Sequence, residues 1–141
     1  MANFDKSFNK LILTEGGYVN DPADRGGETY LGISRVHHPD SLMWPIIDDV
    51  KKVYGTKNIN TRLKSNSSIT KEAKNIYKEE YWDKFRLDEI PSQRIAHEIF
   101  DDAVNRGVRA ATKTLQLILD LDITGKFDDN LFNELLKYAK K

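Results

Sequence analysis

The segment T-E-G-G-Y places one carboxylate, Glu15, after a run of residues that favour a helix and directly before two glycines. Asp21, Asp24 and Glu28 follow within a short segment that also contains glycines. Cleavage of a glycosidic bond generally uses two carboxyl groups that flank the bond, one of which donates a proton. The four acids are therefore compatible with glycosidase chemistry, although paired carboxylates alone are a weak signal.

Glu15 is expected to occupy the last position of the first helix. At about 100° per residue, it returns to within roughly 20° of Phe4, so the two side chains share one apolar stripe. Partial burial disfavours the charged carboxylate, and so does the negative end of the helix dipole. Both effects should raise the pKa of Glu15 and let it act as a general acid. The alternative is a frayed helix end, from which Glu15 points into water.

The elements that must position these acids are mostly helices. Apolar periodicity predicts a mainly α-helical chain with at most a small β-hairpin near residues 19–34. A cap at Asn3 and glycines 16 and 17 delimit the first helix, and Asp128 caps the last one. Between them, we expect a short helix after Pro45, a helix capped by Thr70, one from residue 91 to residue 107, and one containing residues 111–119. The stretch N-I-N-T-R-L-K-S-N-S-S, residues 58–68, is expected to be a polar loop.

Composition limits the classes of function. A chain of 141 residues can form one domain with its own core. The absence of cysteine excludes disulfides, thiolate zinc sites and a cysteine nucleophile. The formal net charge is zero, so no overall field draws the chain to nucleic acid. Residues 51–86 carry ten Lys or Arg against four Asp or Glu, which indicates either a solvated basic face or a polyanion-binding patch.

No cofactor, metal or membrane signal is found. The acids of D-P-A-D-R-G-G-E do not have the spacing of a calcium loop, and His37, His38 and His97 form no zinc motif. No apolar run approaches the ~18 residues of a membrane span, and the N-terminus lacks the apolar core of a signal peptide. We therefore expect a monomer without cofactors or membrane insertion that accumulates in the cytoplasm.

The segment E-G-G-Y-V-N-D-P-A-D-R-G-G-E-T-Y-L-G-I-S resembles the signature of glycoside hydrolase family 108. This family contains lysozyme-like N-acetylmuramidases that occur as phage endolysins and bacterial secretion activators. Similarity continues, in the family's order, through H-H-P-D-S-L-M-W-P-I-I-D, Y-K-E-E-Y-W-D-K-F-R-L-D-E-I-P and F-D-D-A-V-N-R-G. It covers nearly the whole chain. It implies one lysozyme-like domain over residues 1–141, with a catalytic part at 1–90 and a helical part at 91–141 that resembles a peptidoglycan-binding-like segment.

The chain departs from the family pattern at two places. Glu28 stands where the family usually has a small residue, and this extra charge could alter the titration of the site. The C-terminal turn reads D-I-T-G-K-F instead of the D-G-x-x-G type, so the resemblance does not imply cell-wall binding by residues 109–141.

The resemblance implies that Glu15 is the catalytic acid. Phage-type lysozymes, to which the chain is more loosely similar, place an Asp nine residues after this Glu and then a Thr. Asp24 and Thr29 approximate that arrangement, with Thr29 one position off register. Our hypothesis is that Glu15 protonates the glycosidic oxygen while Asp24 positions or activates water, or stabilises the oxocarbenium ion. Asp21 is the alternative second carboxylate.

Six further residues are candidates for binding the sugar. Asp101 and Asn105, four apart on one helix, could donate or accept hydrogen bonds across a cleft, or form a solvated face. Tyr81 and Trp82 could stack on a sugar ring or belong to the core. The full set is Tyr18, Asn20, Tyr81, Trp82, Asp101 and Asn105.

The implied function is hydrolysis of peptidoglycan glycan strands at the β-1,4 bond between N-acetylmuramic acid and N-acetylglucosamine. Without a signal peptide, the protein would reach the wall through a holin-like pore, as a phage endolysin does. Two alternatives remain open. One is a non-catalytic wall-binding or secretion-accessory protein, and the other is a lytic transglycosylase.

Overall fold

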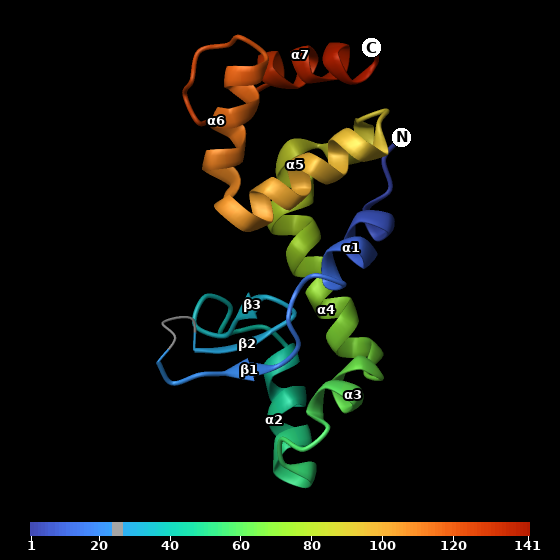
Figure 1. Cartoon of the computed structure of the whole chain (residues 1–141), viewed down its shortest axis with the longest axis vertical. Helices are drawn as coiled ribbons and strands as arrows, with labels where there is room; N and C mark the ends of the chain where they lie inside the picture. Colours follow the sequence, from blue (N-terminus) through green and yellow to red (C-terminus); the bar gives the residue numbers. More distant parts are fainter. Residues whose placement is uncertain (24–26) are drawn as a thin grey trace. The chain divides into compact units, whose positions relative to one another are not determined.

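A computed structural model describes residues 1–23 and 27–141 of the chain (Figure 1). Within these residues, seven α-helices and three short strands are joined by turns, which confirms the predicted mainly α-helical fold. The chain separates into two compact units. Unit 1 consists of Met1–Leu11 and Ile76–Lys141, and unit 2 consists of Ile12–Asn75.

Unit 2 contains an antiparallel sheet in the order β1-β2-β3, within the predicted range of residues 19–34. In its register, Val19 pairs with Thr29, and Thr29 pairs with Ser34. Leu31 and Gly32 join β2 to β3 with φ values of 51° and 77°. Positive φ at both central residues is what a type I′ hairpin turn requires. The strands are β1 (Val19–Asn20), β2 (Glu28–Tyr30) and β3 (Ile33–Ser34).

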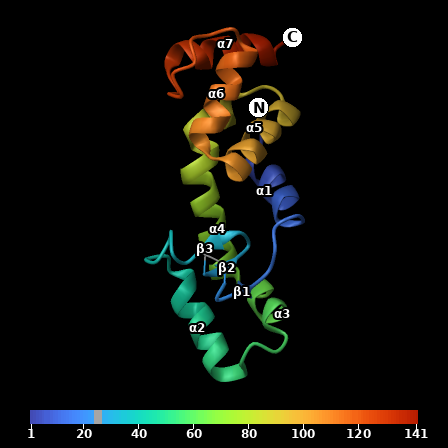
Figure 2. The same cartoon turned by 60° about the vertical axis from the view of Figure 1, so that its left-hand side comes forward.

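The helices of unit 2 are α2 (Met43–Tyr54), α3 (Ile59–Lys64) and most of α4 (Ser67–Tyr77). The predicted loop over residues 58–68 is wrong, because α3 lies within it (Figure 2). This helix contacts α2. Ile59 and Leu63, four residues apart, are both buried and give α3 its apolar face.

The start of α4 also differs from the prediction. The side-chain oxygen of Asn66 accepts hydrogen bonds from the backbone N–H groups of Ser68 and Ile69, at 3.0 and 3.2 Å. Asn66 therefore caps α4, and Thr70 lies inside the helix.

Unit 1 contains α1, a π-helical turn at Lys78–Trp82, and three longer helices. The oxygen of Asn3 accepts from Lys6 N at 3.1 Å, and the carboxylate of Asp128 accepts from Leu131 N at 2.9 Å, so both predicted caps are confirmed. The helix predicted over residues 91–107 begins at Gln93, two residues after Pro91, with Ser92 as its cap. The helices are α1 (Phe4–Ile12), α5 (Gln93–Arg106), α6 (Val108–Ile118) and α7 (Asp129–Ala139).

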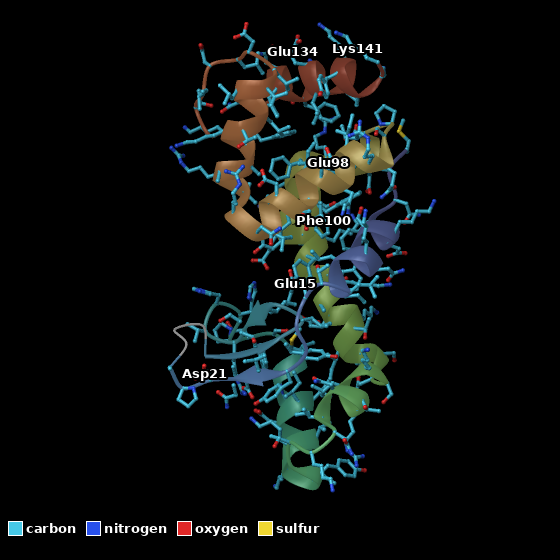
Figure 3. The ribbon with its side chains drawn as sticks, in the orientation of Figure 1. Glu15, Asp21, Glu98, Phe100, Glu134 and Lys141 are labelled. Carbon is cyan, nitrogen blue, oxygen red and sulfur yellow. The ribbon has the colours of Figure 1, made fainter. Side chains whose placement is uncertain are left out.

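The core of unit 1 is built from aromatic rings. Phe100, labelled on α5 in Figure 3, is fully buried and lies edge-on to Phe4, Tyr77 and Trp82, with ring centroids 5.5–6.2 Å apart. Phe4 and Phe8 extend this cluster along α1, with their ring centroids 5.8 Å apart. Edge-to-face packing of this kind adds about 0.5–1.5 kcal/mol per pair beyond the burial of area.

Candidate active site

Glu15 lies in a bend after α1, at the start of unit 2 (Figure 3). The helix ends at Ile12, three residues earlier than predicted, so the helical phase that placed Glu15 on the stripe of Phe4 does not reach it. Leu13 and Thr14 form a turn, and the Glu15 side chain is half-buried. Glu15 therefore belongs to the connection between α1 and β1, and its position depends on what holds that connection.

The backbone directly after Glu15 is held by Asn60 of α3. The N–H of Tyr18 donates to Asn60 Oδ1 at 2.8 Å. A Cβ atom on Gly17 would lie 2.8 Å from Asn60 Nδ2 and closer still to Oδ1, which is tighter than real Cβ contacts. The second glycine of the doublet therefore allows this close approach, whereas a Cβ on Gly16 would meet open space.

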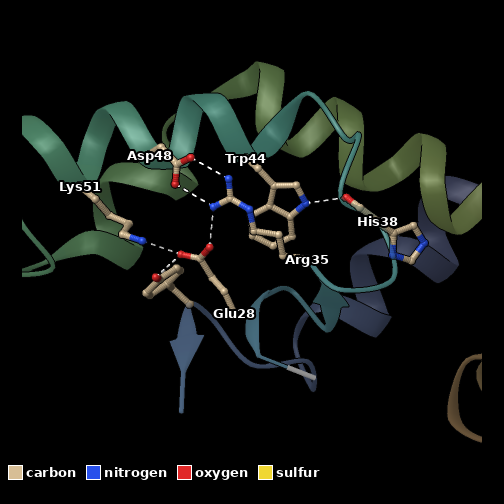
Figure 4. Close-up of polar contacts among 7 residues, drawn as sticks. Glu28, Arg35, His38, Trp44, Asp48 and Lys51 are labelled. Carbon is tan, nitrogen blue, oxygen red and sulfur yellow. Dashed lines mark hydrogen bonds and ion pairs between the residues drawn. The ribbon is translucent and has the colours of Figure 1, made fainter. Parts of the chain in front are cut away.

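Glu28 of β2 is the centre of a polar cluster. Its side chain is only 9% exposed. One carboxylate oxygen, Oε2, accepts from the Tyr18 hydroxyl and from Lys51 Nζ, the latter at 2.7 Å. The other oxygen, Oε1, accepts from Arg35 at 2.7 Å (Figure 4). The segment before β1, the strand β2, the segment after β3 and the helix α2 thus meet at the carboxylate of Glu28.

Arg35 extends the cluster to α2. Its guanidinium donates to both carboxylate oxygens of Asp48, each at 2.8 Å, and lies 5.4 Å from the ring centroid of buried Trp44 (Figure 4). Two acids and two bases therefore alternate, and the cluster is balanced in charge. Charge-assisted, two-point contacts of this kind fix orientation as well as distance.

The cluster keeps Glu28 ionised. Burial alone would raise the pKa of Glu28, but hydrogen bonds from Lys51, Tyr18 and Arg35 together outweigh it and lower that pKa below its ordinary value. The hydrogen bond to Glu28 raises the pKa of Lys51. Burial and the bond to Glu28 raise the pKa of Tyr18. Glu28 is thus an anion at neutral pH and does not serve as a proton donor.

The candidates for a second carboxylate lie beyond β1. Asp24 is outside the described residues. Asp21 lies at the opposite end of β1 from Glu15 (Figure 3), and its Oδ1 accepts from Ala23 N at 2.9 Å. Asn20, at the end of β1, is exposed and pairs with Glu28 in the sheet, while Thr29 is a half-buried residue of the central strand.

The remaining candidates belong to unit 1. Asp101 is half-buried and Asn105 is exposed, both on α5. Tyr81 is half-buried and its ring centroid lies 5.8 Å from that of Tyr77. Trp82 is fully buried in the aromatic core and donates from Nε1 to Asp88 at 2.8 Å, which fits the second of its two expected roles, a core residue.

Sequence patterns missed the residues that contact the segment after Glu15 and the residues of the cluster at Glu28. Asn60 stood in a predicted loop, while Arg35 and Asp48 showed no motif. Lys51 was counted in the basic stretch, but its charge is matched by Glu28. The one available signal was the glycine doublet, since a glycine often marks a close approach of another group to the backbone.

Among residues 1–23 and 27–141, no three His, Asp or Glu side chains gather as metal ligands would. In the same residues, no helix is both long and apolar enough to cross a membrane.

Comparisons with known proteins agree with this fold. The family model for Glycosyl hydrolase 108 matches residues 8–107, which is more than two thirds of the chain. Among solved structures, that of Brucella abortus SagA is similar, with 28% sequence identity and a TM-score of 0.62. The alignment covers 95% of this chain and 68% of that chain. The comparison with curated proteins gives no match.

Proposed function

Because the chain belongs to the glycosyl hydrolase 108 family, we propose that it is a peptidoglycan hydrolase with Glu15 as its general acid. The bond that it cleaves is the β-1,4 bond between N-acetylmuramic acid and N-acetylglucosamine. The observation that carries this proposal is the contrast between two glutamates of unit 2. Glu28 is held ionised by cations, whereas Glu15 is half-buried and follows the carbonyl end of α1.

In the proposed reaction, Glu15 gives its proton to the glycosidic oxygen as the bond from the sugar carbon to that oxygen breaks. The sugar then carries oxocarbenium character, which a second carboxylate stabilises or attacks, or which water activated by that carboxylate quenches. Asp24 is the proposed second carboxylate and Asp21 its alternative. Water supplies the hydroxyl of the new reducing end and restores the proton of Glu15.

The roles proposed for Glu15 and Glu28 follow from their different surroundings. Hydrogen bonds from Tyr18, Lys51 and Arg35 already occupy both oxygens of Glu28, so Glu28 is not proposed as either catalytic carboxylate. Glu15 is the proposed acid because of the family to which the chain belongs and because its side chain is half-buried.

The test is digestion of purified sacculi, followed as loss of turbidity. Glu15→Gln should lower the rate at least ~100-fold, since general acid catalysis typically contributes 10²–10⁴-fold. Glu79→Gln changes an exposed glutamate of the π-helical turn and should leave the rate unchanged. Near wild-type activity of Glu15→Gln would remove the proposal, and intact sacculi with the wild-type protein would indicate a non-catalytic wall binder.

Product analysis separates the finer alternatives. A hydrolase and a lytic transglycosylase give products that differ in mass by one water, and the identity of the reducing-end sugar shows which bond was cut. Asp24→Asn and Asp21→Asn, assayed in parallel, identify the second carboxylate as the one whose loss lowers the rate by a similar factor to Glu15→Gln.

We further propose a role as an endolysin that reaches the wall through a holin-like pore. Expression inside bacteria, with and without a pore-forming protein, tests this role. Lysis should require the pore, and lysis without it would contradict the proposed route.

A further inference from the structure

The segment that carries Glu15 is fixed two and three residues further along the chain. Asn60 Oδ1 accepts the N–H of Tyr18 at 2.8 Å, and its amide lies against the α-carbon of Gly17. Asn60 comes from α3, 42 residues away in sequence from Tyr18. α3 is itself anchored by buried Ile59 and Leu63. A helix with two buried side chains thus supplies the acceptor for a short irregular segment.

The side chain of Tyr18 is fixed independently of its backbone. Its hydroxyl donates to Glu28 Oε2, and Lys51 Nζ lies 5.4 Å from the centroid of its ring. Lys51 also donates to the same Glu28 oxygen at 2.7 Å. Arg35 holds the other oxygen of Glu28, so the acceptor of the Tyr18 hydroxyl cannot rotate freely.

From these contacts, we propose that Asn60 and Glu28 are positioning residues for Glu15. Asn60 sets the path of the backbone at Gly17 and Tyr18, and Glu28 sets the direction of the Tyr18 side chain. Neither residue transfers a proton to the substrate. The inference rests on the proposed role of Glu15 as general acid. It adds Asn60, which no sequence motif assigns to the reaction, and it gives Glu28 a positioning role.

Positioning of this kind has a measurable consequence. A general acid must lie within hydrogen-bond reach of the leaving oxygen. A misplacement of about 1 Å can lower a rate by up to ~10²-fold. Glu15 lies in a bend of unit 2. The Asn60–Tyr18 contact fixes the backbone of the same unit three residues further along the chain, so it limits where the Glu15 carboxyl can lie.

Asn60 is suited to a test because it is exposed, so truncating it should cost little stability. Asn60→Ala should lower kcat on sacculi or soluble glycan strands about tenfold, with KM changed less than about twofold. Asn60→Asp retains an oxygen that accepts the Tyr18 N–H and should recover most of the loss at its own pH optimum. Asn75→Ala, at an exposed asparagine of α4, is the matched control and should behave as wild type.

A second variant tests the side-chain anchor. Tyr18→Phe keeps the ring and removes only the hydroxyl that donates to Glu28. It should lower kcat more than it raises KM. In both Tyr18→Phe and Asn60→Ala, the NMR signal of the Glu15 carboxyl carbon should shift in position or titration, whereas Asn75→Ala should leave it unchanged.

The outcomes separate the two proposals. An inactive wild type, or an active Glu15→Gln, would overturn the proposed function. If wild type is active and Glu15→Gln is not, but Asn60→Ala and Tyr18→Phe keep wild-type kcat and an unchanged Glu15 signal, the positioning role is wrong. If Asn60→Ala unfolds, the kcat and the Glu15 NMR signal of Asn60→Asp and Tyr18→Phe test the positioning role instead.

Discussion

Each of the two units is stabilised internally by a different kind of contact. In unit 1, Phe4, Phe100 and Trp82 pack ring against ring, and Trp82 and Phe100 are fully buried. In unit 2, where three strands have only two or three residues each, the part-buried carboxylate of Glu28 on β2 is bound by two cations and a tyrosine. One core depends on apolar area, and the other adds charge-assisted hydrogen bonds.

The difference shows what each kind of contact can do. Apolar burial is non-directional and scales with area, so it stabilises a helical core without fixing one side chain at one angle. Hydrogen bonds to charged groups have narrow geometry. Strands as short as β1 and β3 bury little area of their own, so polar contacts such as those of Glu28 help to hold them. The segment with Glu15 belongs to this second kind of structure.

The largest effect is expected in the aromatic core. Phe100→Ala should lower the free energy of unfolding by about 3–5 kcal/mol, because it removes a buried ring and leaves a cavity. The shift of the midpoint in urea unfolding measures this. Ile118→Ala truncates a side chain of α6 that is 57% exposed and should shift the midpoint far less. Equal shifts would contradict the assignment of the core to the aromatic rings.

Removal of the charge at Glu28 should have an intermediate effect on the free energy of unfolding. Glu28→Gln keeps the shape but leaves Lys51 and Arg35 without their anionic partner, and it should cost about 2 kcal/mol at neutral pH. The pKa of Glu28 is lowered in the folded protein, so its stabilising contribution is present above its ordinary value of 4.5. The contribution is lost as the pH falls below that value. Urea unfolding at pH 7 and pH 3 should therefore show a difference between wild type and Glu28→Gln that shrinks in acid.

A double-mutant cycle separates this charge effect from a simple loss of packing. Glu28→Gln, Lys51→Gln and the double variant should show a coupling energy between 0.5 and 3 kcal/mol, the range for residues in one network. A coupling energy near zero would mean that Lys51 does not hold Glu28 in solution.

Sequence patterns predicted unit 1 better than unit 2 for a physical reason. The caps at Asn3 and Asp128 and the apolar face of α5 depend on residues three or four apart, which periodicity detects. In unit 2, Ile59 and Leu63 are the buried positions of α3 within a polar run, and the packing of α3 on α2 makes this segment helical. Local helix propensity does not predict that contact.

The candidate site shows the same limit. The position of Glu15 before a glycine doublet was visible in the sequence, but the predicted end of α1 at residue 15 was three residues too late. The contacts that hold the following segment join Tyr18 to Asn60 and Glu28 to Lys51, across 42 and 23 residues. Pairings of such separation follow from the fold, and a single sequence carries no period or spacing that predicts them.

The smallest effect on the free energy of unfolding is expected at an exposed ion pair of unit 1. This pair joins an Arg to a Glu, as does the cluster at Glu28 in unit 2, so the two units can be compared with the same residue types. Arg94 lies 3.3 Å from Glu98 on α5, with both side chains mostly exposed. Arg94→Ala should change the free energy of unfolding by no more than about 0.5 kcal/mol, and added salt should abolish the change. Arg35→Ala removes contacts to both Glu28 and Asp48 and should cost more, with weaker dependence on salt. Equal and equally salt-sensitive effects would mean that the cluster at Glu28 is an ordinary surface ion pair, and the distinction between the two units would then rest on the aromatic core alone.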